Sequence, residues 1–390
     1  MAFAAASILA LGGFGSAASS DADALSDSAK GGGDARLQVT LAEPAPLGAV
    51  ALNREVLAEG LDIPWSIAFL PDGRILVAER AGQLRVIENG VLRAEPITGA
   101  PAVLARNQGG LFDVLPHKDF SENGVLYLVY AAGTVEENAT RVARATFDGA
   151  ALSDVELIYE AIPLKGAGYH FGGRLVWGGD EKLYLTVGEG SNYKELAQDM
   201  TTSFGAVIRL NDDGSIPADN PDFGADAAPG LYSKGHRNPQ GLAYDPVRGV
   251  LWEHEHGARG GDEINIIEAG VNYGWPFATY GIDYNGLRIS PFTEYEGTAQ
   301  PYKYWTPSIA PSGLAVYRGN VFPDDWDGDL LVGGLADETL HRVDLDGDKE
   351  VGEERYDLGQ RVRDVRVGPD GAIYVATDDG VVARLTPASE

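Results

Sequence analysis

The sequence has 390 residues, of which 44 % are hydrophobic, and it contains 51 glycines, 21 prolines and no cysteine. The formal net charge of -28 at pH 7 makes nucleic acids and anionic membranes poor partners, because a strongly acidic surface repels both. The lack of cysteine excludes disulfides, thiolate metal sites and a cysteine nucleophile.

The first residues of the chain are small and apolar. Residues 2–15 form an apolar run, and the GSAASS stretch after it resembles a signal-peptidase site. We therefore expect residues 1–20 to be a signal peptide and the protein to be periplasmic or secreted. No basic residue precedes Lys30, so a disordered tail is the alternative. Residues 21–50 are rich in Ala, Asp, Ser, Gly and Pro and predict a flexible linker. No other segment approaches the ~20 apolar residues of a membrane span, and no membrane insertion is expected.

After residue 50, a unit made of two short apolar strands and a turn occurs six times. The residues between the two strands, such as PDG in SIAFLPDGRILVAER, are those that prefer tight turns. The six units span residues 66–80, 110–131, 173–189, 241–257, 313–334 and 364–379. Further strand-like stretches, such as QLRVIENGV and TRVARATFDG, follow several of them.

The repeated unit predicts an all-β fold for residues 51–390, which we take as one catalytic domain. No long stretch shows apolar residues at helical spacing, so helices are expected to be rare. Four short antiparallel strands repeated radially are typical of a β-propeller, and six units indicate six four-stranded blades. The long connections 191–234 and 258–308 are then loops over one face, where we expect the active site. A β-sandwich or a two-domain β protein is the alternative fold.

The candidate site residues lie just before the first strand of each unit. In a propeller these inner strands line the axis, so the residues that enter them meet at one mouth of the central channel. The six stretches contain a histidine, three arginines, amides and tryptophans: Pro64-Trp65, 107–109, 169–172, 236–240, 305–311 and 360–363. Convergent polar groups in a concave place predict a ligand site, and arginines in an acidic protein predict an anionic ligand.

Several motifs follow one another along the chain: NQGGLFD, YHFGGRLVWG, GHRNPQGLAYDP, EHGARGGDEINII, YGWP and RVRDVRVGPDG. In these motifs the chain resembles the soluble quinoprotein sugar dehydrogenases, which use pyrroloquinoline quinone (PQQ) and calcium. The resemblance implies a six-bladed propeller, in agreement with the repeat. It also implies an enzyme that oxidises aldose sugars at C1 to lactones by hydride transfer to PQQ.

The resemblance assigns roles to individual residues at the mouth. His170 is expected to contact the cofactor and to act as the general base for the sugar C1 hydroxyl, which a neutral imidazole can do. Arg361 and Arg363 match a pair that meets the quinone oxygens and carboxylates, which makes Arg361 a catalytic as well as a cofactor-binding residue. Their alternate positions in a strand would turn both side chains to the same side.

Four further residues match positions near the cofactor or offer a surface for it. Arg237 and Asn238 match a second pair that contacts PQQ. Gln108 matches a glutamine near substrate and cofactor. Trp305 either supplies a flat face to the cofactor or belongs to the core.

The calcium segment and one cofactor contact depart from the family pattern. In HGARGGDE the resemblance implies that the backbone carbonyls of Gly257 and Ala258 bind calcium, although the usual second residue is proline. The carbonyl is the ligand, so alanine is tolerable. In VGGLADETL, Ala336 stands where the family commonly has a lysine. Losing one charge-assisted contact costs ~1.5–3 kcal/mol of binding free energy. Arg259 is a candidate to compensate for the missing lysine.

Two other functions stay open. A calcium-dependent propeller lactonase or hydrolase needs carboxylates and asparagines around an axial ion, whereas the mouths present Arg, His and Gln. A non-catalytic binding propeller descended from the dehydrogenases is the other, because Ala336 replaces a cofactor contact. The expected partners are aldose sugars and an electron acceptor that the sequence does not identify. The sequence is also compatible with a homodimer.

Overall fold

The structure is a computed structural model that describes residues 43–347 and 349–388. The signal peptide expected at residues 1–20 and most of the linker expected at 21–50 lie outside the described residues. Among the helices in the described ranges, none is long and apolar enough to cross a membrane.

The described residues form six antiparallel sheets of four strands, which are the six blades that the repeat predicted. In the first three blades the strands are, in sheet order, β2 (Pro64–Phe69), β3 (Ile75–Glu79), β4 (Leu84–Glu88) and β5 (Val91–Leu92); β6 (Leu111–Pro116), β7 (Val125–Gly133), β8 (Asn138–Phe147) and β9 (Leu152–Glu160); β10 (Leu175–Trp177), β11 (Leu183–Val187), β12 (Ala206–Leu210) and β13 (Leu231–Lys234).

The next two blades follow the same order along the chain, and the sixth includes the first strand of the described chain. Their strands are β14 (Pro239–Asp245), β15 (Val250–Glu255), β16 (Asp262–Ile266) and β17 (Lys303–Trp305); β18 (Pro311–Val316), β19 (Leu330–Gly334), β20 (Thr339–Asp346) and β21 (Lys349–Asp357); β22 (Val362–Val367), β23 (Ile373–Thr377), β24 (Val381–Pro387) and β1 (Leu52–Ala58). Helix is rare, as expected: α1 (Phe120–Asn123) and the 3-10 turns η2 (Lys194–Gln198) and η3 (Asp324–Trp326) are the described helical elements.

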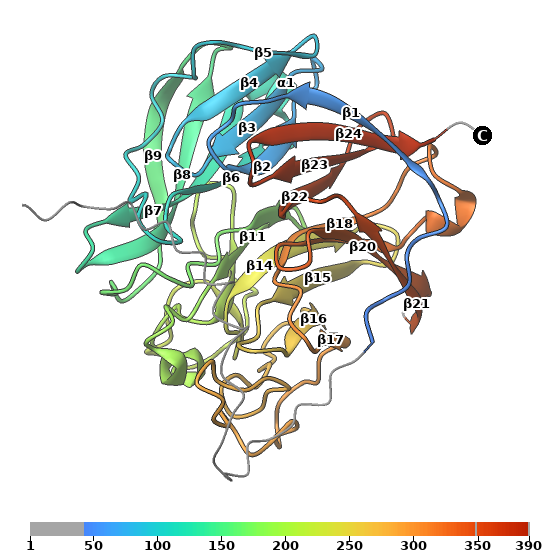
Figure 1. Cartoon of the computed structure of the whole chain (residues 1–390). Coiled ribbons are helices and arrows are strands. Elements are labelled where there is room, and N and C mark those ends of the chain that lie inside the picture. Colours follow the sequence, from blue (N-terminus) through green and yellow to red (C-terminus); the bar gives the residue numbers. More distant parts are fainter. Residues whose placement is uncertain (1–42, 348, 389–390) are drawn as a thin grey trace, which may run out of the picture. The chain divides into compact units, whose positions relative to one another are not determined.

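The ring of blades closes through the N-terminal strand. β1 pairs antiparallel with β24, from Leu52 opposite Pro387 to Ala58 opposite Val382, and Figure 1 shows the blue β1 beside the red β24. The β1 sequence LNREVLA is largely exposed and lacks a clear apolar alternation, so the sequence pattern did not indicate this strand. The closure ties the two ends of the domain together.

The chain segment before β1 is also attached to the domain. The backbone N–H of Arg355 in β21 donates to the carbonyl of Pro46 at 2.9 Å, and the N–H of Gly48 donates to the carbonyl of Arg355 at 2.9 Å. The guanidinium of Arg355 also reaches the carbonyl of Ala45 at 2.9 Å. The described end of the expected linker is therefore hydrogen-bonded to the fifth blade.

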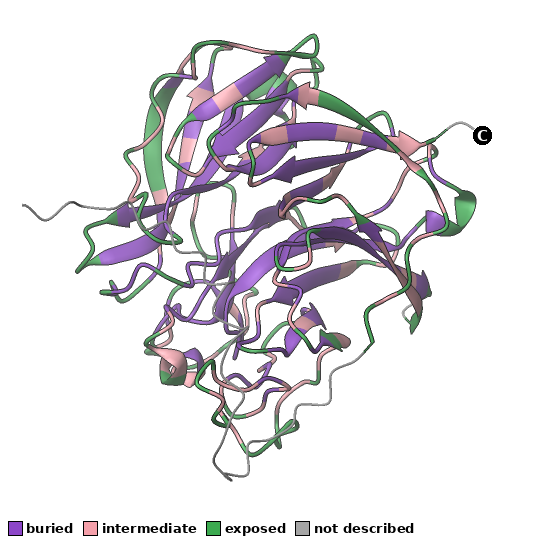
Figure 2. Cartoon of the chain, in the orientation of Figure 1, coloured by how far each residue is buried: buried purple, intermediate pink, exposed green. Residues whose placement is uncertain are grey.

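The first strand of each blade lies at the centre. β2, β6, β10, β14, β18 and β22 contact one another in a closed ring. Figure 2 shows these strands buried along most of their length, and apolar side chains fill the spaces between adjacent blades. Because the inner strands are buried on both faces, their sequences are continuous apolar runs.

The repeated turn has a local cause in its PDG sequence. Gly73 and Gly371 adopt φ of 89° and 79°, a conformation that costs glycine little. The preceding aspartate accepts the backbone N–H two residues on: Arg74 to Asp72 at 3.1 Å, and Ala372 to Asp370 at 3.2 Å. Turns of this kind connect β2 to β3 and β22 to β23 and leave the opposite ends of these inner strands for the site.

Candidate active site

The residues that enter β6, β10 and β14 meet at one end of the inner strands. The backbone N–H of His170 donates to Oε1 of Gln108 at 2.8 Å, and the N–H of Gly172 donates to Oδ1 of Asn238 at 3.3 Å. The N–H of Glu189, just after β11, donates to the carbonyl of Arg237 at 2.9 Å. The structure thus brings together His170, Gln108, Arg237 and Asn238, which are far apart in the sequence.

The imidazole of His170 is held by a buried carboxylate. Its Nδ1 lies 2.9 Å from Oε1 of Glu189, a side chain that is only 1 % exposed. Because a carboxylate only accepts, we assign the ring proton to Nδ1, which leaves the Nε2 lone pair open. No described residue hydrogen-bonds Nε2. The arrangement orients a histidine whose free nitrogen can accept a proton.

Burial keeps His170 uncharged. Burial and the nearby Arg237 lower the pKa of His170 to about 4, against the opposing influence of Glu189. An imidazole with this pKa is neutral at pH 7, and a general base must be neutral before it acts. The sequence predicted a base at this position, whereas the low pKa depends first on burial, which the tertiary structure decides.

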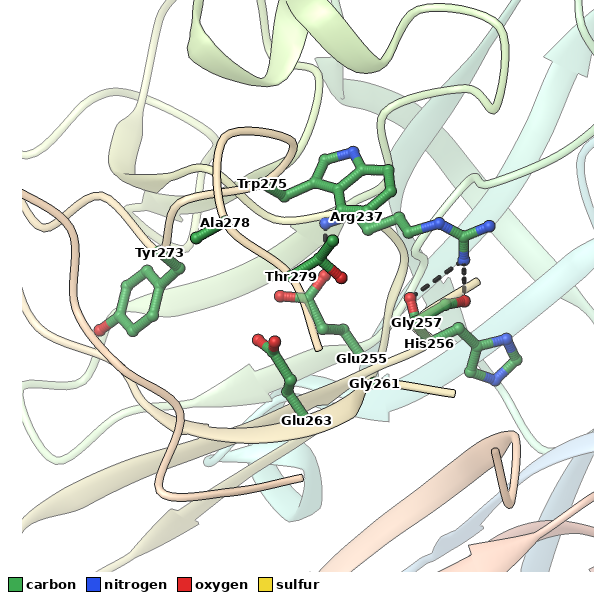
Figure 3. A pocket seen from close by; sticks show the side chains of 10 residues that line it. All are labelled: Arg237, Glu255, His256, Gly257, Gly261, Glu263, Tyr273, Trp275, Ala278 and Thr279. Carbon is green, nitrogen blue, oxygen red and sulfur yellow. Dashed lines mark hydrogen bonds between the residues drawn. The ribbon is translucent and has the colours of Figure 1, made fainter. Parts of the chain in front are cut away.

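The guanidinium of Arg237 lies beside this histidine and forms no ion pair with a carboxylate among the described residues, whereas the backbone N–H of Arg237 donates to Oε2 of Glu255. Its Nη1 donates to the carbonyl of His256 at 3.0 Å and to that of Gly257, and its guanidinium lies 5.3 Å from the ring centroid of Trp275. Figure 3 shows these two hydrogen bonds and the Trp275 ring next to the arginine. A buried guanidinium bonded only to carbonyls keeps its positive charge available to an anion.

The arginines of the sixth blade point to the same side, as their spacing predicted. Nε of Arg361 lies 3.0 Å from Oδ2 of Asp378, and Nε of Arg363 lies 2.7 Å from Oδ1 of the same carboxylate. Although burial opposes it, the two guanidiniums lower the pKa of Asp378. Two positive charges share one negative charge, so this part of the mouth carries a net positive charge.

Ala336 lies next to this arginine pair. Arg361 Nη1 donates to the carbonyl of Leu335 at 2.9 Å, and the N–H of Ala336 donates to the carbonyl of Ile309 at 2.9 Å. The alanine is exposed. The departure from the family pattern therefore falls beside Arg361, where a longer side chain has room.

Trp305 belongs to the hydrophobic core, which is one of the two roles that the sequence left open for it. It lies in β17, is 8 % exposed and packs in the cluster between the fourth and fifth blades. Its Nε1 donates to Oε1 of Glu353 at 2.8 Å, beside the buried His341. Trp275, which the sequence analysis did not single out, is the tryptophan that contacts Arg237.

Gly257, whose carbonyl accepts a hydrogen bond from Arg237, lines a small pocket. The carboxylates of Glu255 and Glu263 line it, with residues of the loop between β16 and β17, and face one another in Figure 3. Burial, followed by the charge of Glu255, raises the pKa of Glu263. Carboxylate and carbonyl oxygens together are a donor set that suits calcium.

A second acidic group lies deeper on the same strands. The ligand atoms of His236, Glu253 and Glu255 all lie within 4.8 Å of one another, and all three residues are buried. Burial and the charge of Glu255 raise the pKa of Glu253. Oε1 of Glu253 and Oδ1 of Asn265 are buried without a hydrogen-bond partner. The alternation of acidic residues in EHEHG and DEINI was the available signal for this group.

The glycines after His170 have a packing role. A Cβ atom on Gly172 would lie 2.6 Å from the carbonyl oxygen of Thr186, and one on Gly173 would lie 2.7 Å from the ring of Phe112. Both glycines also have positive φ, 67° and 105°. The contacts within and between blades therefore account for the two glycines.

The chain is similar to known sugar dehydrogenases over most of its length. The family model of glucose/sorbosone dehydrogenases matches residues 61–384. The chain is 42 % identical over 354 residues to the aldose sugar dehydrogenase YliI of Escherichia coli, covering 86 % of this chain and 93 % of that one. It is 30 % identical over 419 residues to quinoprotein glucose dehydrogenase B of Acinetobacter calcoaceticus, covering 84 % and 85 %.

A solved structure extends this similarity to the fold. The PQQ-bound form of the aldose sugar dehydrogenase of Streptomyces coelicolor matches with a TM-score of 0.71 and 27 % identity over 88 % of this chain and 99 % of that one. The fold, the mouth and these matches together define an enzyme of the sugar dehydrogenase class. The chain belongs to the glucose/sorbosone dehydrogenase family.

Proposed function

We propose that the protein oxidises aldose sugars at C1 to lactones in a reaction that depends on PQQ and calcium. The observation that carries the proposal is the neutral His170, whose Nδ1 is held by Glu189 and whose Nε2 is open at the arginine-lined mouth. His170 takes the proton of the C1 hydroxyl at Nε2. Glu189 then stabilises the imidazolium that this proton creates.

The charge at the mouth supports an anionic cofactor. The guanidinium of Arg237 has no carboxylate partner among the described residues, and the guanidiniums of Arg361 and Arg363 share the single carboxylate of Asp378. The excess positive charge fits a planar tricarboxylate, and we assign its binding to these arginines with Asn238 and Gln108. When bound, PQQ would supply the quinone that accepts the hydride from C1.

The donor set of the pocket lined by Gly257, Glu255 and Glu263 supports calcium. The carbonyls of Gly257 and Ala258 would hold the ion that assists the cofactor, with Glu255 and Glu263 as the carboxylates nearest to them in the cavity lining. An oxygen-only donor set with flexible geometry is what calcium prefers. The ion would polarise a carbonyl of the cofactor, and its charge would also offset the buried carboxylates.

The lactonase alternative is less compatible with the axis of the propeller. Asp113 and Asp364 project from the inner strands but are paired with arginines: Arg174 Nη1 lies 3.0 Å from Oδ1 of Asp364, and Arg366 Nη2 lies 3.1 Å from Oδ1 of Asp113. Carboxylates neutralised in this way are poor ligands for an axial ion. We therefore retain the oxidoreductase as the proposed function.

The location of the protein in the cell is also proposed, from its N-terminal residues. We propose a periplasmic or secreted enzyme that passes electrons from the cofactor to a separate acceptor, because the N-terminal run resembles an exported leader. Detection of the mature N-terminus in the periplasm or medium of an expressing bacterium would support export. Retention of an unprocessed chain in the cytoplasm would contradict it.

Reconstitution tests the function directly. The protein is freed of metal with a chelator, and PQQ, calcium or both are added while absorbance spectra and dye-linked oxidation of an aldose are recorded. We expect oxidation and lactone formation only when both are present, and no hydrolysis of an added lactone above that of a buffer blank. A protein that leaves the PQQ spectrum unchanged and oxidises no aldose would support the non-catalytic binding propeller instead.

A further inference from the structure

One buried ammonium group holds three consecutive residues around the histidine of the site. Lys165 is 3 % exposed. Its Nζ donates to the carbonyl of Tyr169 and, at 3.0 Å, to that of His170, and lies 3.7 Å from the ring centroid of Phe171. No described carboxylate lies within ion-pair distance of it. A buried charge of this kind is costly, which points to a role beyond filling the core.

The backbone of His170 needs such support. Its φ is 48°, in the left-handed region that costs a residue with a side chain about 1–2 kcal/mol. Its N–H is bound by Gln108, and its carbonyl accepts Gly190 N–H at 3.2 Å as well as Lys165 Nζ. An unfavourable conformation persists only where its surroundings hold it, and the direction of the imidazole depends on this backbone.

Lys165 also faces the base electrostatically. The charged or titratable groups that face His170 are Glu189, Arg237, Lys165 and His256. Oε2 of Glu189 is buried without a hydrogen-bond partner, so the ammonium offsets a carboxylate that is otherwise only half satisfied. Burial lowers the pKa of Lys165 to about 7, so the lysine is charged throughout the range in which His170 titrates.

We propose that Lys165 is a positioning residue for His170: it fixes the left-handed backbone of the base through two carbonyls and places a positive charge behind it. The proposal rests on the proposed function of His170 as the base. Nothing in the sequence around LKGAGYH marks the lysine, because its contacts arise from the fold of residues 161–173 back onto β8 and β11.

The chain offers a matched control. Lys234 is also buried, at 0 % exposed, and burial lowers its pKa to about 7. Its Nζ donates to the carbonyls of Thr202 at 3.0 Å and Phe204 at 2.7 Å, in the segment between η2 and β12, and forms no hydrogen bond with residues 169–171. Lys165→Met removes a buried amino group from the loop that carries His170, whereas Lys234→Met removes the same group from the end of β13.

Two readouts distinguish positioning of the base from a general loss of stability. For Lys165→Met we expect kcat per bound PQQ to fall by about ten- to a hundredfold while the KM for the sugar changes little, because the base is displaced. We also expect the titration of His170, followed by NMR in the cofactor-free protein and assigned by its loss in His170→Gln, to move to higher pH by about half a unit or more. Lys234→Met should move neither quantity.

A second variant separates the hydrogen bonds from the charge. Lys165→Gln keeps an N–H donor but is neutral, so kcat should recover partly while the titration of His170 stays raised. The proposal is overturned if both Lys165 variants keep the wild-type kcat and titration, if Lys234→Met changes them equally, or if both Lys165 variants fail to fold, which would assign Lys165 to the fold alone. A wild-type protein that oxidised no aldose would refute the proposed function, and the NMR titration would still decide whether Lys165 acts on His170.

Discussion

Nδ1 of His170 lies 2.9 Å from Oε1 of Glu189, with the two side chains 9 % and 1 % exposed. This contact joins the loop before β10 to the end of β11. It favours the tautomer with the proton on Nδ1, so Nε2 is the nitrogen that would accept the sugar proton under the proposed function.

Replacing the carboxylate should therefore slow the chemistry. In Glu189→Gln we expect kcat to fall at least about tenfold, because the amide neither selects the tautomer as well nor stabilises the imidazolium. The loss of the negative charge should also lower the pKa of His170 further. Steady-state kinetics measure the first effect. Glu181→Gln, an exposed carboxylate paired with Lys118, is the control and should change neither quantity.

Removing the base should affect turnover far more than cofactor binding. His170→Gln keeps a polar side chain of similar reach but cannot accept the proton, so turnover should fall at least about a hundredfold. Reconstitution with PQQ and calcium and the melting temperature should stay near those of the wild type. His117→Gln, a buried histidine just after β6, should lower stability and leave turnover per folded protein intact. Wild-type turnover per bound PQQ in His170→Gln would refute the mechanism.

Activity should persist well below the ordinary titration range of histidine. The pKa of His170 is lowered to about 4, so the base stays neutral at pH 5, and kcat/KM should fall only as the pH passes through about 4. A half-maximal point near 6.5 would contradict the buried geometry. The profile is measured with an acceptor dye whose own response does not change over this range.

The free energy of unfolding should also depend on pH below the ordinary pKa of histidine. The pKa of His254 is lowered to about 3 by burial, and that of His170 to about 4. Below their ordinary value of 6.5 the unfolded chain binds more protons at these two residues, so their contribution to the free energy of unfolding should decrease as the pH falls from 6.5 toward 4. Denaturant titrations at several pH values, with His254→Gln as the comparison, measure this slope.

A lysine at position 336 should strengthen the binding of PQQ. Ala336 is exposed beside Leu335, whose carbonyl accepts Arg361, so a longer side chain has room to reach an anion bound there. Ala336→Lys should lower the dissociation constant by about tenfold or more, as one charge-assisted contact does. Ala336→Gln has a long side chain but no charge and should have little effect. An unchanged constant in Ala336→Lys would mean that another cation, such as Arg259, already serves the cofactor.

The blades could be predicted because each is built from consecutive residues. The PDG turns and the short apolar runs act locally, so six hairpins in a row predict six sheets and place residues such as His170 and Arg237 at one mouth. The exception is β1, whose exposed residues pair with β24 at the far end of the chain, a partnership that exists only when the ring closes.

The chain order alone thus determined the blade number and which polar residues enter the inner strands. The tertiary structure decided their chemistry. Glu189 and Lys165 have no distinctive sequence context. Glu189 reaches the His170 ring from the end of β11, and Lys165 reaches the His170 carbonyl because the segment that holds both residues folds back on itself. The lowered pKa of His170 depends first on burial, a property of the closed ring that no neighbour in the sequence supplies. The core position of Trp305 was likewise decided by packing between the fourth and fifth blades, because a tryptophan at that point of the chain suits a buried strand and a binding face equally well.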